Sequence, residues 1–259
     1  MAPKAHDAGE MGDLRAAGET LRASLGFRAR LVAAADGATP PEGAKKVHFI
    51  RHGEGFHNVA QREWRAKPDW DGKSEPYTLD QDPDGKFEDP LLTPKGEGQA
   101  KDLQPRVASL APELLVVSPM RRATQTALIA FERQVAGGEL PVLAHELCHE
   151  RAGRHTCDRR LPKTKLAALY PAVDYKLIDS EEDPYWGDGW TREDLPTLAA
   201  RAAGFIDWLL ARPERHVAVA AHSALLLAVF NAACECECAD TRSHFETGEM
   251  RTVLLSVER

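Results

Sequence analysis

Short apolar runs alternate with helix-like segments along this chain, and this alternation constrains the fold more than any other feature. The runs lie at residues 45–50, 113–117, 140–143 and 216–220, and a last one at 251–257. Each has the length of a buried strand, and the segments between them carry helix signals such as a threonine before a proline or apolar residues on one side. Strands that alternate with helices predict an α/β fold, a doubly wound and mostly parallel sheet in three layers.

Polar side chains follow three of these strands where each one ends. Arg51 and His52 follow the first run, the segment Ser118–Arg122 follows the second, and His222 and Ser223 follow the run at 216–220. The carboxyl ends of parallel strands share one edge of a sheet, and α/β proteins bind ligands there. An arginine guanidinium matches phosphate geometry and a neutral imidazole can attack phosphorus. Any one of these segments alone could be a solvated loop, but together they predict phosphate chemistry.

The composition excludes several classes of partner. The net charge of −7 argues against nonspecific binding to nucleic acid or to an acidic membrane surface. No apolar run approaches the length of a membrane span, and the first residues lack the layout of a signal or transit peptide. We therefore expect a cytoplasmic protein that binds neither nucleic acid nor membrane.

The cysteines favour a reducing compartment. The chain has 5 of them, an odd number in a chain that is not small, so a disulfide framework is not expected. Cys234, Cys236 and Cys238 cluster, but their spacing matches no common zinc motif. We interpret them as free thiols at a helix end or loop, with metal binding as a minor alternative.

The chain divides at about residue 44. Residues 1–44 have a weak helical spacing of leucines and end at Pro40–Pro41, so we expect a helical extension. Residues 45–259 form the predicted α/β domain. Two long irregular segments, at about 61–92 and 144–190, are expected to be insertions, since loops of this length are commonly functional.

Three motifs resemble those of the histidine phosphatase superfamily, which includes the cofactor-dependent phosphoglycerate mutases. The first, Arg-His-Gly-Glu followed by an asparagine, corresponds to residues 51–54 and Asn58. The second, Ser-x-Leu-x-Arg-Ala-x-x-Thr, is matched across residues 118–126, with Met120 in place of leucine. The third, a strand that ends in a histidine, is matched by His222. The resemblance covers about residues 45–257 and implies the phosphoglycerate mutase-like fold.

The resemblance also implies a mechanism and a set of site residues. His52 would be the nucleophile that forms a phosphohistidine, and no metal or cofactor would be needed. The groups that would hold the phosphoryl oxygens or donate further hydrogen bonds to substrate are Arg51, Asn58, Arg122, His222 and Ser223. His222 also counts among the catalytic residues. The implied partner is a small phosphorylated substrate, and a homodimer is left open.

The proton donor is the open assignment, because Glu146 and Glu150 both follow the third run. The family usually has leucine two positions before this glutamate, and neither residue here has it. Glu150 precedes Arg151 and Gly153, which is nearer to the Glu-Arg-x-x-Gly stretch of the mutases, so we predict that Glu150 is the acid. We interpret Glu146 as a solvated carboxylate or as a capping carboxylate.

Three functions follow from these observations. We expect a phosphomonoesterase that works through a phosphohistidine, because residues 144–160 diverge from the mutases. Phosphoglycerate mutase-type phosphoryl transfer is the alternative. The segment His145-Glu146-Leu147-Cys148-His149 also matches a zinc metalloprotease signature, with His155 as a third ligand. Ala152 stands where that motif requires glycine, so the zinc protease is a remote alternative.

Overall fold

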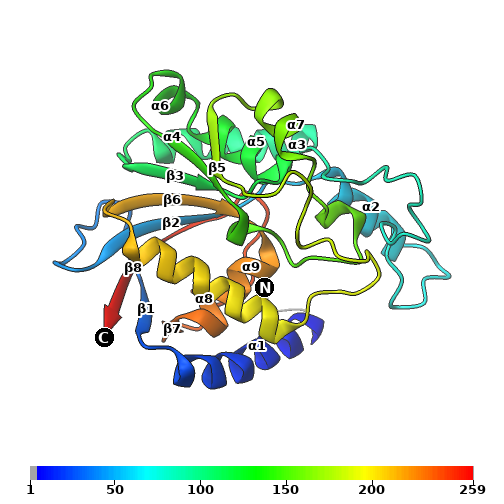
Figure 1. The fold of residues 1–259 in the computed structure, drawn as a ribbon, viewed down its shortest axis with the longest axis horizontal. Coiled ribbons are helices and arrows are strands. Elements are labelled where there is room, and N and C mark those ends of the chain that lie inside the picture. The colour runs from blue at the N-terminus through cyan, green and yellow to red at the C-terminus, as the bar shows by residue number, and fades with distance from the viewer. Residues whose placement is uncertain (1–4, 259) are drawn as a thin grey trace.

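A computed structural model describes residues 5–258, and Figure 1 shows a central sheet between two layers of helices. The order of the strands is β5-β4-β3-β6-β2-β8-β1-β7, and β8 is antiparallel to its neighbours β1 and β2 while the other pairs are parallel. The strands are β1 Arg28–Ala33, β2 Lys45–Arg51, β3 Leu114–Val117, β4 Val142–His145, β5 Val173–Leu177, β6 His216–Ala221, β7 Glu235–Cys236 and β8 Met250–Glu258. The prediction of a three-layer, mostly parallel α/β fold is confirmed.

The helices cover the two faces of the sheet, and each face has its own apolar core. One layer contains α1 Ala5–Ser24, α8 Leu195–Ala211, α9 Ser223–Ala228 and the π-helix η3 Val229–Ala233. The other contains α3 Pro94–Asp102, α4 Gln104–Val107, α5 Arg121–Ala130 and α7 Lys163–Leu169. The remaining elements are α2 Phe56–Arg65, α6 Glu132–Ala136 and the 3₁₀ turns η1 Glu146–Cys148 and η2 Thr156–Asp158.

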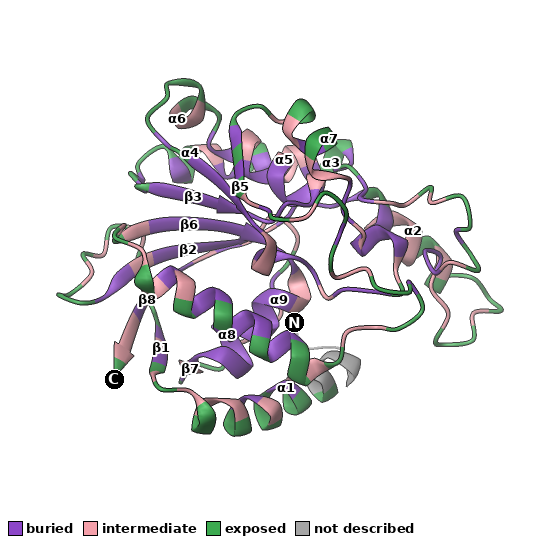
Figure 2. Ribbon diagram, viewed as in Figure 1, coloured by how far each residue is buried: buried purple, intermediate pink, exposed green. Residues whose placement is uncertain are grey.

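The central strands are buried on both sides, as Figure 2 shows. In β6, Val217 and Val219 pack into the core beneath α8, while Ala218 and Ala220 pack into the core beneath α5. Successive side chains of a strand point to opposite faces of the sheet, so alternate residues of β6 belong to different cores. The run of apolar residues in each central strand therefore follows from burial on two faces.

The N-terminal segment differs from its prediction as a helical extension. α1 is helical, but Arg28–Ala33 forms the strand β1, which pairs with β8 along its whole length. Leu14 of α1 is fully buried and Leu31 of β1 is 2% exposed, both in the core that also contains α8. Residues 28–33 were wrongly included in a helical segment, and they complete the sheet together with β7. Among residues 5–258, no helix combines the length and apolarity that a membrane span needs.

The cysteine cluster lies beside β1. Cys234 follows η3 directly, and Cys236 belongs to β7, which pairs with β1 in parallel. All five cysteines are free thiols, and Cys238 alone is exposed. The interpretation as a helix end therefore fits Cys234, whereas Cys236 contributes to the sheet instead of lying in a loop.

The loop after β2 is packed directly onto α3. Thr93 caps α3 by accepting a hydrogen bond from Gly96 N, and Thr93 N donates to Glu54 O at 2.8 Å. A Cβ atom on Gly96 would lie 2.1 Å from Glu54 O, so only glycine permits this approach. α3 ends at Asp102 and α4 begins at Gln104, since Pro105 has no N–H to continue the hydrogen-bond ladder.

This contact gives a prediction about stability. Gly96→Ala is expected to lower the free energy of unfolding by about 2–3 kcal/mol, because backbone atoms cannot move aside for the new methyl group. Gly98→Ala is the matched control in the same helix, where a Cβ meets nothing within 4 Å. That substitution should stabilise the protein by about 0.5–1 kcal/mol. Urea unfolding of both variants measures the difference, and equal effects would contradict the packing argument.

Candidate active site

His52 lies at the carboxyl end of β2 and is 1% exposed. Its Nδ1 lies 2.7 Å from Gly53 O, so this nitrogen carries the proton and donates it to the carbonyl. Nε2 is then left with its lone pair, and Arg122 Nε donates to it at 3.3 Å. The imidazole therefore presents an unprotonated nitrogen beside a guanidinium, which is the form that can attack phosphorus.

Two further histidines surround His52. The ring of His222 lies 5.1 Å from that of His52 and the ring of His57 lies at 5.6 Å, measured between centroids. His222 reaches this position because β6 pairs in parallel with β2, and His52 N donates to Ala221 O at 3.0 Å. Ser118 Oγ holds His222 Nε2 at 2.7 Å. The ends of β2, β3 and β6 thus meet as the sequence predicted.

Several buried polar atoms around His52 have no protein partner. In residues 5–258, the buried side-chain nitrogen and oxygen atoms without a hydrogen bond are Arg51 Nε, His57 Nδ1, His222 Nδ1 and the hydroxyl oxygen of Tyr175. The first three belong to side chains grouped around His52. Buried polar atoms are normally satisfied, so this concentration indicates a site for a polar ligand.

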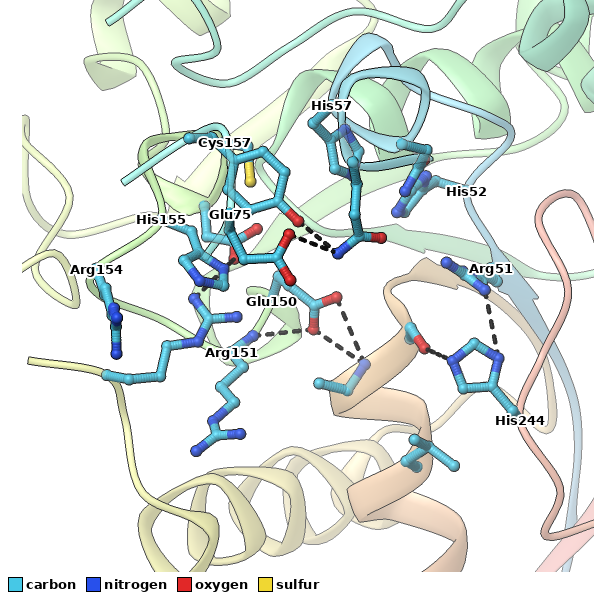
Figure 3. A pocket seen from close by; sticks show the side chains of 18 of the residues that line it. Arg51, His52, His57, Glu75, Glu150, Arg151, Arg154, His155, Cys157 and His244 are labelled. Carbon is cyan, nitrogen blue, oxygen red and sulfur yellow. Dashed lines mark hydrogen bonds and ion pairs between the residues drawn. The ribbon is translucent and has the colours of Figure 1, made fainter. Parts of the chain in front are cut away.

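A cavity of about 410 Å³ opens beside these groups, and Figure 3 shows Arg51, His52 and Glu150 facing it. Asn58 and Ser223, which the sequence analysis assigned to substrate binding, also line it. Asn58 Oδ1 accepts a hydrogen bond from Gly55 N at 2.9 Å, which fixes the side chain at the start of α2. Arg122 and His222 reach the site through their contacts with His52 and are not among the lining residues.

Arg51 and Ser223 are connected through a histidine that the sequence analysis missed. Ser223 Oγ lies 2.6 Å from His244 Nε2, and Arg51 Nη1 lies 3.4 Å from His244 Nδ1. Arg51 Nη1 also donates to Phe245 O at 2.6 Å. The segment before β8 therefore fixes the position of Arg51 from the opposite side of the site.

The charges of the site keep the imidazoles neutral. Burial lowers the pKa of His52 well below its usual value, and the nearby guanidinium groups of Arg122 and Arg51 lower it further. The pKa values of His57 and His222 are lowered in the same way, first by burial and then by Arg122. A neutral His52 retains its lone pair down to a lower pH than a free imidazole would.

The structure separates the two candidate acids. Glu150 lines the cavity, and its Oε1 accepts hydrogen bonds from the backbone N–H groups of Arg151, Ala224 and Leu225 at 2.9–3.3 Å. Burial raises the pKa of Glu150, and the negative charge of Asp158 raises it further. Glu146 instead pairs with the buried guanidinium of Arg160 at 3.0 Å and does not line the cavity. Of these two glutamates, Glu150 is the one that lines the cavity.

The zinc protease interpretation is wrong. His145 ends β4, and a 3₁₀ turn follows it, so the segment never forms the α-helix on which the two histidines would share a face. His145 packs between Phe205 and Trp208, with ring centroids at 5.6 and 4.2 Å. Both nitrogens of His149 are engaged, by Glu150 O at 2.8 Å and Asp183 Oδ2 at 2.9 Å.

One group of side chains in residues 5–258 has the spacing of a metal site, but cationic side chains already occupy its carboxylate. Ligand atoms of His155, Cys157 and Asp158 lie within 4.8 Å of one another. Both carboxylate oxygens of Asp158 already accept hydrogen bonds, from Arg122 and from Arg192. Two guanidinium groups at the same carboxylate oppose a cation, so this set does not fit a resident metal.

The cavity wall includes many residues that the sequence analysis did not select. They come from α2 and from the two irregular segments with their flanking loops, and they include His57, Gln61, Lys73, Tyr77, Arg154 and Arg192. His155 also lines the cavity, although the sequence analysis named it only as a zinc ligand. Neither segment has a period that would mark one face. The only available signal was the charged stretch Thr156–Arg160, which lies close to the proposed acid in sequence.

The model of the histidine phosphatase superfamily (branch 1) matches residues 81–257, more than half of the chain. The chain belongs to the histidine phosphatase superfamily. The Arg-His-Gly-Glu segment at residues 51–54 precedes the matched range. Membership supports an enzyme that acts on phosphate groups, and it confirms the family resemblance seen in the three motifs.

Individual members agree with this assignment. A phosphoglycerate mutase-like protein of Arabidopsis thaliana is 32% identical over 251 residues, which cover 85% of this chain and 87% of the relative. Phosphoglycerate mutase-like protein 1 of the same plant is 30% identical over 253 residues, covering 85% of this chain and 84% of the relative.

A solved structure shows the same fold. The alpha-ribazole phosphatase of Shigella flexneri superimposes with a TM-score of 0.51 at 16% identity, covering 80% of this chain and 89% of that one. At this identity the likeness concerns the fold alone.

Proposed function

We propose that this histidine phosphatase superfamily member is a phosphomonoesterase that hydrolyses a small phosphorylated substrate through a phosphohistidine at His52. The single observation that carries the proposal is the neutral His52 Nε2, held 3.3 Å from the Arg122 guanidinium and surrounded by unpartnered buried polar atoms. Those atoms, on Arg51, His57 and His222, suit the oxygens of a phosphoryl group. Catalysis of phosphoryl transfer depends mainly on such positioning and charge stabilisation.

In the first step, His52 Nε2 forms a bond to phosphorus as the bond from phosphorus to the ester oxygen breaks. Glu150 gives its proton to that oxygen, so the product leaves as a neutral alcohol and Glu150 becomes a carboxylate. The Nδ1 proton stays on His52 and is hydrogen-bonded to Gly53 O, which stabilises the positive charge of the phosphoimidazole. The cationic and neutral donors around His52 stabilise the phosphoryl oxygens throughout.

In the second step, water attacks phosphorus and the N–P bond breaks. The Glu150 carboxylate takes a proton from that water, and His52 leaves as the neutral imidazole with which the cycle began. The backbone N–H groups of Ala224 and Leu225 hold the Glu150 carboxylate in place for this role. Acid and base are thus one residue, and each turnover restores both groups.

Phosphoglycerate mutase-type transfer is the second candidate, because the relatives named above carry mutase-like names. It shares the first step and differs in what receives the phosphoryl group. A phosphatase releases inorganic phosphate, whereas a mutase returns the group to a second substrate position. The ratio of released phosphate to isomerised substrate separates the two.

The test of the proposed function is to trap the intermediate. The protein is mixed with a phosphorylated substrate, quenched in alkali and digested, and the peptide that contains His52 is examined by mass spectrometry. We expect one added phosphate on this peptide, stable in alkali and lost in acid, as a phosphohistidine is. Phosphate release without any labelled intermediate, or a label on another residue, would refute the proposal.

A further inference from the structure

Asp158 lies behind the reacting groups, at the end of the 3₁₀ turn η2, and is 4% exposed. Its Oδ1 accepts a hydrogen bond from Arg122 Nη2 at 2.9 Å, and its Oδ2 accepts one from Arg192 Nη1 at 2.8 Å. His155 Nδ1 lies 3.7 Å from the same Oδ2. A buried carboxylate thus joins two arginines that lie 70 positions apart in the chain.

The contact with Arg122 determines where that guanidinium points. Arg122 Nη2 is held by Asp158 and Arg122 Nη1 donates to Cys157 O at 2.7 Å, which leaves Nε to face His52 Nε2 at 3.3 Å. The planar fork of an arginine cannot satisfy two fixed acceptors and still rotate. The segment 157–158 therefore sets the direction of the guanidinium that donates to His52 Nε2.

Asp158 also supplies one of the charges that act on Glu150. Both residues line the same cavity, and the charged or titratable groups that act on the Glu150 carboxyl come from four different parts of the chain. They are Arg51 of β2, Arg122 of α5, Cys157 and Asp158 of η2, and Arg192 before α8. Among these, Asp158 is the carboxylate, so it alone carries a negative charge at neutral pH.

We propose that Asp158 is a positioning residue of the reaction: it aims Arg122 at His52 and places a fixed negative charge in the wall that holds Glu150. The inference rests on the proposed function of His52 and Glu150. Asp158 reaches His52 through Arg122, which is bound to both residues. Its ion pairs with Arg122 and Arg192 keep it ionised, and the pKa of its carboxyl is accordingly far below the ordinary value.

Two substitutions test this proposal because they should act in opposite directions. Asp158→Asn removes a negative charge from the surroundings of Glu150, so the acid loses its proton at a lower pH. Arg192→Gln removes a positive charge, so the acid keeps its proton to a higher pH. We measure kcat/KM against pH with an alkyl phosphate and follow the pH at which activity falls on the alkaline side. This pH should decrease by about one unit in Asp158→Asn and increase in Arg192→Gln.

The first variant should also lose rate. In Asp158→Asn, Arg122 is no longer held by a charged acceptor, and kcat/KM at the pH optimum should fall about 10- to 100-fold. Asp158→Glu keeps the charge and is expected to restore the position of the alkaline limb even where the rate stays low. The matched control is Asp183→Asn, a buried carboxylate that pairs with His149 outside the cavity. Its loss should cost stability without moving the limb.

A measurement without turnover separates this proposal from the proposed function. The protonated carboxyl band of Glu150 is identified by infrared spectroscopy as the band missing in Glu150→Gln, and it is titrated in the wild-type protein and both variants. Opposite shifts of its midpoint support the role of Asp158 even if no phosphomonoester is hydrolysed. Midpoints that stay fixed, or that move in the same direction in both variants, overturn the inference.

Discussion

Replacing His52 by alanine is expected to lower kcat for any phosphomonoester substrate by about 10⁴- to 10⁶-fold. The unprotonated Nε2 of His52 faces Arg122 at 3.3 Å, and neither of the two neighbouring histidines is held in this position, so we do not expect them to take over the attack on phosphorus. The ring centroids of His57 and His222 lie 5.6 and 5.1 Å from that of His52. Steady-state phosphate release and the alkali-stable label on the protein should both disappear together.

His145→Ala is the matched control for this experiment. His145 is similarly buried, at 7% exposed, and it also ends a strand of the sheet, but it packs against Phe205 and Trp208 outside the cavity. Its activity should stay close to that of the wild-type protein, with circular dichroism showing that both variants fold. An active His52→Ala variant would exclude the phosphohistidine mechanism.

Glu150→Gln has the second largest expected effect, a loss of about 10²- to 10⁴-fold in kcat/KM for an alkyl phosphate. Glutamine keeps the shape and can still meet the N–H groups of Ala224 and Leu225, but it has no proton to give to the leaving oxygen. The loss should be much smaller with p-nitrophenyl phosphate, whose leaving group needs little protonation. Comparing the two substrates therefore isolates the proton donor.

The pH profile gives the same assignment from another direction. Burial and Asp158 raise the pKa of Glu150, so the acid form persists to a higher pH than an ordinary glutamate would allow. Activity should fall as the pH rises through this value, because the donor is then ionised. Glu150→Gln should lack this alkaline limb. Persistence of the limb in the variant would assign it to another group.

Glu146→Gln is the control for the acid. It removes half of the ion pair with the buried Arg160, so it should lower the free energy of unfolding while leaving kcat near the wild-type value at a temperature where the variant is folded. A larger rate loss in Glu146→Gln than in Glu150→Gln would reverse the assignment of the proton donor.

The strands and the reactive residues at their ends could be predicted because both depend on local sequence. Val47 to Ile50 and Val217 to Ala220 are apolar at every position or nearly so, as burial on both faces of a sheet requires. Parallel strands share one edge, so His52 and His222 were expected near each other before any coordinates. The arginines and histidines also carry their chemistry in their side chains, independent of context.

Some elements could not be predicted because their stability comes from distant partners. β1 alternates arginine with alanine and leucine, but its pairing with β8 joins residues more than two hundred positions apart. β7 has only two residues, too few to show a period. Their sequences fit loops as well as regular structure, and only the neighbouring strands and helices select between them.

The same reason limits the active site. Sequence alone determined that two imidazoles and two guanidinium groups follow the ends of strands, because side-chain chemistry and strand periodicity are local. The tertiary structure alone decided that Glu150 and not Glu146 enters the cavity, and that Asp158 binds both Arg122 and Arg192. These choices depend on the paths of irregular segments, which are fixed by burial and hydrogen bonds with residues far away in the chain.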